Sequence, residues 1–338
     1  MAAAAAPAPQ VICLGEALVD RLGPLGGDPA TAPAEQCDDR LGGAPANVAC
    51  ALARLGTSTA LAGRLGSDAI GEAFRQLLLS RGVDLSALQS DPTRPSRIVL
   101  VRRDAGGDRS FGGFAGDRGE GFADQALDAA ALEVALPPLL REARWLQVGT
   151  IPLATQASAA ALTAAMQLAA HAHVAVALDV NWRPTFWDPA AAPDSGPTAE
   201  AVAVMRPLLE QAALIKLAAE EAGWLFGSTD PAAIRAALPQ QPAVVVTDGG
   251  AQVAWCFGAS SDVMPVYPVA VADSTGAGDA FLAGLLHQLC VQPQVLDGNS
   301  AEAVRFASAC GALVCSGAGA IDPQPTQEEV EAFLAGRL

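Results

Sequence analysis

The chain has 338 residues, of which 51% are hydrophobic, and its formal net charge is −16 at pH 7. This length allows a large buried core, and no apolar run in the sequence reaches the length of a membrane span. The acidic balance argues against nucleic acid and anionic membranes as partners, because phosphate-rich surfaces attract basic proteins.

The chain begins with residues 1–9, which are Ala and Pro after the initial Met and include no basic residue. We expect a disordered start here and no signal peptide. A short β run over 10–14 follows, and Asp20 comes soon after it. Polar groups just past a strand end face the ligand crevice of an α/β sheet. Asp20 is therefore a candidate acceptor for substrate hydroxyls, with a solvated loop aspartate as the alternative.

A Gly- and Pro-rich loop over 23–39 leads into the run Leu41-Gly42-Gly43-Ala44-Pro45-Ala46-Asn47-Val48-Ala49. The paired glycines Gly42 and Gly43 let the backbone approach a ligand, and Pro45 fits the start of a helix that runs to about Arg54. Asn47 would point from the first turns of that helix. Capping is its alternative role, although the position is late for an N-cap.

The sequence predicts a strand over 60–63 and a helix over 70–81, and the pattern of secondary structure changes after them. Short β segments over 96–102 and 110–114 are joined by residues 104–108, which have the chemistry of a hairpin turn. Because no helix separates these segments, they do not belong to a βαβ layer.

From Leu127 onward the sequence alternates helix and strand, which is typical of a doubly wound, mostly parallel sheet flanked by helices. Asp179, Asn181 and Arg183 follow one buried strand and alternate along the chain, so they face one side and indicate a site. The expected strands lie at 145–149, 174–178, 214–217, 243–247 and 252–257, and the expected helices at 155–170, 198–211 and 301–315.

The most informative stretch joins a strand-like run over 263–271 to a helical segment over 280–289. It places Gly276, Ala277 and Gly278 at a helix N-terminus, where their N–H groups can converge on an anion that the helix dipole also favours. Asp279 would repel a phosphate, but it is well placed to take a proton from a hydroxyl that attacks one. The pattern predicts phosphoryl transfer to an alcohol. The alternative is ordinary dipole complementation at a tight turn without a ligand.

Other nucleotide motifs do not fit. The sequence contains no Gly-Lys-Ser/Thr of a Walker loop. The pair Gly276-x-Gly278 lacks the third small residue of a dinucleotide fingerprint, which disfavours a nicotinamide oxidoreductase.

The run Asp273-Ser274-Thr275-Gly276-Ala277-Gly278-Asp279-Ala280-Phe281 resembles the C-terminal signature of the PfkB family of carbohydrate kinases, D-T-x-G-A-G-D-x-F. The run from Gly42 to Ala49 resembles its N-terminal signature, in a form closer to fructokinases than to ribokinases. The resemblance extends from about Val11 to the C-terminus. It implies a ribokinase-like α/β domain over 10–338, with a small β lid drawn from about 18–41 and 96–115.

The resemblance also implies an activity, namely ATP-dependent transfer of a phosphoryl group to a primary hydroxyl of a sugar, with Mg²⁺. D-fructose is the favoured acceptor; 2-keto-3-deoxygluconate, ribose and a nucleoside are the alternatives, as is a non-catalytic sugar-sensing protein. The implied sugar contacts are Asp20, Gly42, Gly43, Asn47, Asn181 and Arg183. The lid would add Arg97, Phe111 and Phe114, for which packing is the alternative.

The same resemblance places the nucleotide. The implied contacts are Asp179, Lys216, Thr247, Gly249, Gly276, Gly278, Ser308 and Gly319. Glu221 matches an acid that holds Mg²⁺ through water, but Ala218 replaces the usual Asn or Ser, and Glu220 and Glu221 could simply start a helix. By analogy with the family, Asp273 and Thr275 are candidates for a monovalent cation such as K⁺.

Two further expectations concern the setting. Seven cysteines form no Cys-x-x-Cys pair, which predicts buried thiols in a reducing compartment and a cytoplasmic protein. The open edges of the lid strands predict a homodimer that forms through the lids.

Overall fold

The computed structural model describes residues 7–104, 109–297 and 300–337. Residues 1–6 of the expected disordered start and 105–108 of the expected hairpin turn lie outside the described residues. The main sheet has nine strands in the order β13-β12-β11-β10-β9-β8-β1-β4-β5, and all neighbours are parallel except the pairs made by β12 and β13. The strands are β1 (Val11–Leu14), β4 (Thr59–Gly66), β5 (Leu88–Asp91), β8 (Trp145–Gly149), β9 (Ala175–Asp179), β10 (Leu214–Ala218), β11 (Ala243–Asp248), β12 (Gln252–Phe257) and β13 (Ser260–Pro265).

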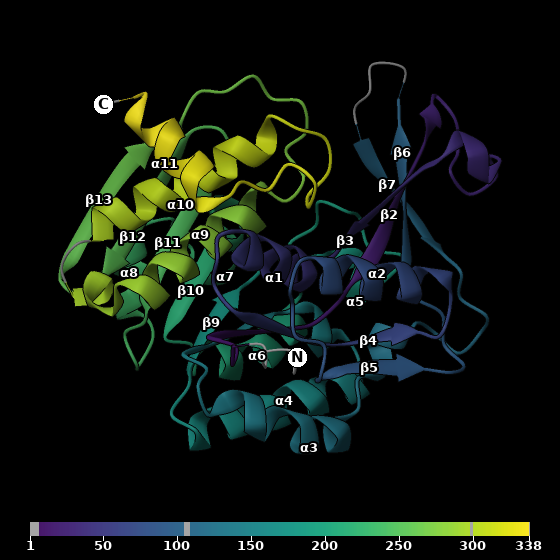
Figure 1. Ribbon diagram of the computed structural model, residues 1–338, viewed down its shortest axis with the longest axis horizontal. Helices are drawn as coiled ribbons and strands as arrows, with labels where there is room; N and C mark the ends of the chain where they lie inside the picture. Colours follow the sequence, from purple (N-terminus) through teal and green to yellow (C-terminus); the bar gives the residue numbers. More distant parts are fainter. Residues whose placement is uncertain (1–6, 105–108, 298–299, 338) are drawn as a thin grey trace, which may run out of the picture.

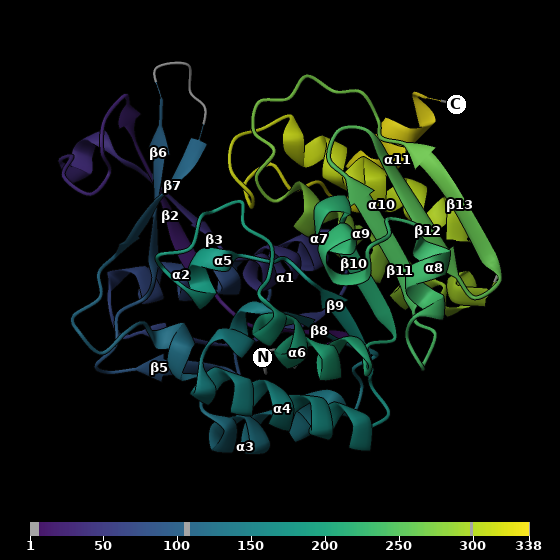
Figure 2. The ribbon, with the colours of Figure 1, turned by 180° about the vertical axis from the view of Figure 1, so that it is seen from behind.

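Helices cover both faces of this sheet. Alternate residues of its central strands accordingly belong to different buried clusters. In β1, Val11 and Cys13 pack with α1, α2, α9 and α10, while Ile12 and Leu14 pack with α3, α4 and α6. The two views show these layers on opposite sides of the sheet (Figures 1 and 2). The predicted doubly wound, mostly parallel sheet flanked by helices is confirmed. The helices are α1 (Ala44–Arg54), α2 (Ala69–Ser80), α3 (Ala129–Leu140), α4 (Gln156–His171), α5 (Pro184–Trp187), α6 (Ala199–Leu209), α7 (Ala219–Phe226), α8 (Pro231–Ala236), α9 (Ala277–Val291), α10 (Ser300–Cys315) and α11 (Gln327–Ala335).

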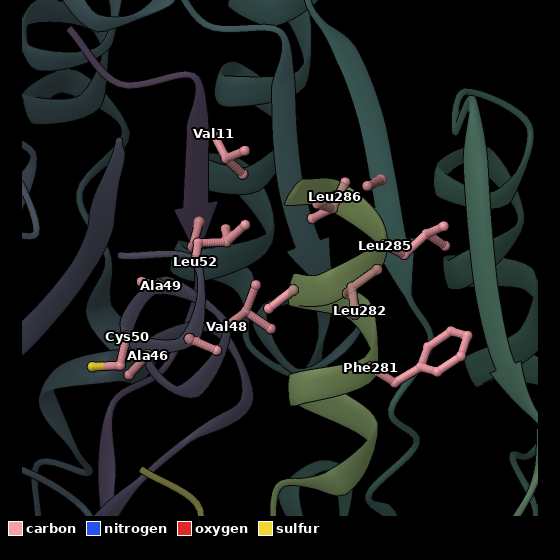
Figure 3. Packing of buried hydrophobic residues seen from close by; sticks show 14 of the residues in the cluster. Val11, Ala46, Val48, Ala49, Cys50, Leu52, Phe281, Leu282, Leu285 and Leu286 are labelled. Atoms are coloured by element: carbon pink, nitrogen blue, oxygen red, sulfur yellow. The ribbon is translucent and has the colours of Figure 1, made fainter. Parts of the chain in front are cut away.

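Helices α1 and α9 pack against each other in the core, as Figure 3 shows. Val48 and Leu52 of α1 and Leu282 and Leu286 of α9 are fully buried there. Each such side chain stabilises the fold by about 1.5–3 kcal/mol relative to an exposed one. This contact sets the N-terminal halves of the two helices side by side, and both halves carry predicted site residues.

A separate four-stranded sheet has the order β3-β2-β6-β7. Its strands are β2 (Leu18–Leu25), β3 (Asp38–Gly42), β6 (Ile98–Arg103) and β7 (Arg109–Ala115). They come from the two ranges in which the lid was expected, and the sheet stands beside the helical layer that contains α1 (Figure 1). We call this sheet the lid.

Two local expectations differ from the structure. The strand expected over 263–271 is β13 (Ser260–Pro265), and no strand continues beyond Pro265. Pro265 and Pro268 have no N–H to donate to a strand ladder, which explains the early end. Strand β5 was not expected; it pairs with β4 at the edge of the sheet.

Candidate active site

A cleft of about 1270 Å³ opens at the carboxyl ends of the parallel strands, below the lid. Residues that follow β1, β9, β10 and β11 line it, together with side chains of the lid strands β2, β6 and β7. This position follows the rule that open α/β sheets bind ligands where their strands end. The cleft brings together Asp20, Gly43, Asn47, Phe111, Asp179, Asn181, Arg183, Lys216, Glu221, Thr247, Gly249, Thr275, Gly276, Ala277, Gly278, Asp279 and Ser308 from the predicted set.

Helix α9 begins at the floor of the cleft, as the small-residue motif predicts. Gly276 is its N-cap in the left-handed region, with φ 79°, and a Cβ added there would lie 2.5 Å from the Cβ of Ala320. Only glycine fits this turn. The N–H of Ala277 donates to the carbonyl of Ser274 at 3.2 Å, so this amide is engaged within the turn and does not complete the expected set of three. The N–H groups of Gly278 and Asp279 belong to the first turn, where a helix provides no acceptor for them.

The carboxylate of Asp279 lies in this first turn and lines the cleft. Its Oδ2 accepts a hydrogen bond of 2.8 Å from Nδ2 of Asn47 on α1. Burial raises the pKa of Asp279 to about 6, and the nearby charge of Asp179 adds to this, while Asn47 and the cations Lys216 and Arg183 oppose it. The group is therefore mostly ionised at neutral pH and can accept a proton.

Asn47 also carries an unused acceptor. Its Oδ1 is buried and has no hydrogen-bond partner among the described residues, although the residue lines the cleft. Buried polar atoms in native proteins are almost always hydrogen-bonded, so an orphaned acceptor at a cleft indicates a missing ligand group. The structure thus favours a binding role for Asn47 over a capping role.

A buried ion pair lies beside the start of α9. Lys216, the only lysine of the chain, donates to both carboxylate oxygens of Asp179 at 2.8 and 2.9 Å. Burial alone would lower the pKa of Lys216, but Asp179 more than offsets it and the pKa is raised, so the side chain is charged. A Cβ added to Gly278 would lie 3.2 Å from Nζ of Lys216. The single lysine therefore places a positive charge next to the free amides of α9.

Glu221 is buried and both of its oxygens accept backbone N–H groups. Oε1 accepts from Trp182 at 2.6 Å and Oε2 from Ala218 at 2.7 Å. The second bond closes the first turn of α7, so the helix-starting alternative describes its main contacts. Burial raises the pKa of Glu221, and the charge of Asp179 raises it further. The methyl group of Ala218 adds no polar ligand at this wall of the cleft.

Two predicted lid residues do not reach the cleft. Arg97 is buried, pairs with Asp124 at 2.9 Å, and lies over the rings of Phe114, Phe122 and Phe186. Phe114 packs edge-on against Phe111, and of these two rings only Phe111 lines the cleft. Packing, the alternative considered for both, is the role that the geometry supports.

Three other predicted residues, Gly42, Asp273 and Gly319, do not line the cleft themselves. Gly42 ends β3 and is paired with Leu18. Its neighbour Gly43 lines the cleft at φ 98°, where a Cβ would come within 2.8 Å of the Glu16 carbonyl oxygen. The N–H of Gly319 donates to Oδ2 of Asp273 at 2.9 Å. Neither Gly319 nor the buried Asp273 lines the cleft.

Glu16 was missed by sequence reasoning. It is buried, lies two residues after the end of β1, and lines the cleft. Its Oε1 accepts the N–H of Ala44, and burial raises its pKa to about 8. The rule that singled out Asp20, a polar group just past the end of β1, would have identified it. At neutral pH this carboxyl is mostly protonated and can donate a hydrogen bond.

Within the described residues, no cluster of His, Cys, Asp and Glu could hold a metal ion by itself. Mg²⁺ rarely needs such a cage, because it keeps several waters and binds through one or two carboxylates and the phosphates of a substrate. The acids Asp179 and Glu221 at the cleft fit this mode. No helix among the described residues is long and apolar enough to cross a membrane.

Comparison with known proteins finds related sequences over most of the chain. A family model described as "pfkB family carbohydrate kinase" matches residues 8–327. The fructokinase of Salmonella typhimurium is 32% identical over 325 residues, covering 95% of this chain and 98% of the relative.

Solved structures show the same fold. Fructokinase from Xylella fastidiosa with bound ATP has a TM-score of 0.81 at 27% identity, covering 97% of this chain and 98% of that one. Fructokinase from Vibrio cholerae O395 in a form with fructose, ADP and calcium ion has a TM-score of 0.77 at 29% identity, with 97% and 99% coverage.

Proposed function

The chain belongs to the pfkB family of carbohydrate kinases and is a sugar kinase, and from this premise we propose that it phosphorylates D-fructose with ATP to give fructose 6-phosphate. The hydroxyl oxygen of the sugar attacks the γ-phosphorus, a new O–P bond forms, and the bond from that phosphorus to the bridging oxygen of ADP breaks. The hydroxyl proton passes to a base in the cleft. The observation that carries the proposal is the pairing of Asp279 and Asn47 at the start of α9.

Asp279 is the base in this proposal. Its Oδ1 remains for the sugar hydroxyl while Asn47 holds Oδ2. A pKa of about 6 leaves it ionised at neutral pH yet basic enough to accept the proton as the hydroxyl attacks. Asn47 fixes the orientation of the carboxylate and keeps its own Oδ1 for another hydroxyl of the same sugar.

The first turn of α9 and Lys216 receive the negative charge of the transferred group. Gly278 and Asp279 line the cleft, and their N–H groups belong to the first turn, at the positive end of the helix dipole. Nζ of Lys216 lies beside them. Preorganised donors of this kind stabilise charge that develops on phosphoryl oxygens. When bound, Mg²⁺ would add charge neutralisation on the nucleotide phosphates, with Asp179 and Glu221 as the acids near its waters.

The sugar would lie between α1 and the lid. Asp20 offers a carboxylate acceptor and Glu16 a protonated donor, and Asn181 and Arg183 line the same cleft. Phe111 and Val101 of the lid would cover the ring and exclude water, which limits wasteful hydrolysis of ATP. The run Gly42 to Ala49 and the names of the relatives support fructose over ribose.

The nucleotide would occupy the remaining half of the cleft. Thr247, Gly249 and Ser308, together with Tyr267, Ala312 and Cys315, line the cleft and would contact the nucleotide there. The latter three gave no signal in the sequence. They come from the segment after β13 and from the end of α10, and only the fold brings them to the cleft.

A panel of sugars tests the substrate. Purified protein with Mg-ATP is assayed for ADP release with D-fructose, D-ribose, 2-keto-3-deoxygluconate and adenosine, and the phosphorylated carbon is identified by NMR. We expect kcat/KM for fructose to exceed the others by at least about tenfold, with phosphate on carbon 6. A higher value for another acceptor would replace fructose. ADP release with none of them would favour the sugar-sensing alternative.

We also place the protein in the cytoplasm as a homodimer that forms through the lids. All seven cysteines are free thiols, five of them buried, which suits a reducing compartment. The edge strands β3 and β7 leave open hydrogen-bonding groups that a second lid could cover. Light scattering coupled to size exclusion should give twice the monomer mass. A monomer at micromolar concentration would refute the dimer.

A further inference from the structure

The carboxylate of Asp273 is buried on the loop that leads into α9. Its Oδ1 accepts the N–H and the hydroxyl of Thr275 at 3.0 and 2.6 Å, and its Oδ2 accepts the N–H of Gly319 at 2.9 Å. Asp273 thereby joins the turn before α9 to the loop after α10. A buried negative charge beside a nucleotide site needs a positive partner, because it is otherwise both desolvated and close to phosphates.

That partner comes from the lid. Nη1 of Arg40, on strand β3, lies 3.7 Å from Oδ2 of Asp273. The guanidinium is held in place by two hydrogen bonds to Oδ2 of Asp38, at 2.6 and 2.8 Å. Gly319 makes room for it, because a Cβ at that position would lie 3.2 Å from Nη1 of Arg40. The hydrogen bonds to Asp38 raise the pKa of Arg40, and the charges of Asp38, Asp273 and Asp322 raise it further, so the guanidinium stays protonated.

This arrangement does not fit a monovalent cation at Asp273 and Thr275. A potassium ion bound to Oδ2 of Asp273 would share that oxygen with the N–H of Gly319 and would lie a few ångström from a guanidinium. Two positive charges at this distance repel strongly in a partly buried site. The hydroxyl of Thr275 already donates to Oδ1 of the same carboxylate.

We propose that Arg40 takes the place of a monovalent cation: it supplies from the lid the positive charge that neutralises Asp273 and holds the turn before α9. The inference rests on the proposed kinase function for its kinetic consequence. Arg40 is a positioning residue in this account, since it acts through Asp273. Its origin on β3 also links the lid, where the proposed function places the sugar, to the start of α9, where it places the transferred phosphoryl group.

The test compares ions and variants at constant ionic strength. Wild type, Arg40→Ala and Arg40→Lys are assayed with Mg-ATP and fructose in KCl or choline chloride, and the melting temperature of each ADP complex is measured as KCl replaces choline chloride. The matched control is Arg21→Ala, which removes a similar lid ion pair, Arg21 to Asp39 at 2.6 Å, that does not touch Asp273. The melting curves need no turnover, so they test the inference even if no sugar is phosphorylated.

For the wild type, Arg40→Lys and the control, we expect kcat in KCl and kcat in choline chloride to differ by less than about twofold. Replacing choline by K⁺ should not raise the melting temperature of any of the three. Arg40→Ala should lose about tenfold or more in kcat in choline and recover part of it in K⁺, with a K⁺-specific rise in melting temperature. A wild type that K⁺ activates and stabilises would overturn the proposal. So would an Arg40→Ala variant that K⁺ leaves unchanged, whether active or inactive. Should that variant fail to fold, the response of the wild type and Arg40→Lys to K⁺ still tests the proposal.

Discussion

Nδ2 of Asn47 donates a hydrogen bond of 2.8 Å to Oδ2 of Asp279, joining two residues 232 positions apart in the chain. The packing of α1 on α9, shown in Figure 3, holds the two side chains together. Both residues line the cleft. A carboxylate held by an amide on one oxygen presents its other oxygen to a ligand.

Asn47→Ala should change the pH dependence of the reaction. The hydrogen bond favours the charged form of Asp279, so its loss raises the pKa of that carboxyl above its present value of about 6. The base is lost as pH falls through its pKa, so the acid limb of the kcat profile should move to higher pH. A profile between pH 5 and 9 measures the shift, with Gln76→Ala, on the exposed face of α2, as the control. An unmoved limb with lower activity would show that Asn47 binds sugar without tuning the base.

Asp279→Asn should stabilise the protein. The folded-state pKa of about 6 lies above the ordinary aspartate value of 3.8, so the folded state binds the proton more tightly than the unfolded chain. Stability from this group is therefore fully present below the unfolded pKa and is lost as pH rises through about 6. At pH 8 the neutral amide avoids that loss and should raise the free energy of unfolding by roughly 1–3 kcal/mol. Urea unfolding at pH 8 and pH 4 measures this. An equal gain in the free energy of unfolding at both pH values would contradict the titration of Asp279 as the cause.

Lys216→Met should destabilise the fold, because it leaves the buried carboxylate of Asp179 without its partner. We expect a loss of about 3–5 kcal/mol. The double variant with Asp179→Asn removes the uncompensated charge and should recover much of the stability without recovering activity. Chemical unfolding together with the ADP assay separates the two effects. Full activity in either variant would remove Lys216 from the phosphoryl site.

Much of the fold and the centre of the site could be predicted from the sequence, because their signals are local. Each strand or helix, and the run of small residues before Asp279, can be recognised from a short stretch of neighbouring residues in the sequence. The roles of Arg97 and Phe114 could not be assigned from the sequence. Side chains on a hairpin give the same sequence pattern whether they contact a ligand or pack against a neighbouring ring. The contact of Arg40 with Asp273 left no local trace, because only the closed fold brings β3 to the loop before α9.

Gly276→Ala should disrupt the turn that opens α9. The residue has φ 79°, and a Cβ would lie 2.5 Å from that of Ala320, so strain and a clash coincide. We expect a loss of about 1–3 kcal/mol or more in stability and a large fall in kcat. Gly223→Ala in α7 is the matched control: a Cβ there meets no neighbour within 4 Å, and alanine in a helix should stabilise by about 0.5–1 kcal/mol. Similar melting temperatures for the two variants would contradict this reading of the turn.

The central claim is that Asp279 takes the proton of the attacking hydroxyl, and the most direct test is kcat of Asp279→Asn beside its affinity for fructose and ATP. The amide keeps the shape of the side chain and can still accept from Asn47, so binding measured by calorimetry should change little. We expect kcat to fall by a factor of about 10² to 10⁴. A variant that binds both substrates and turns over at the wild-type rate would contradict it.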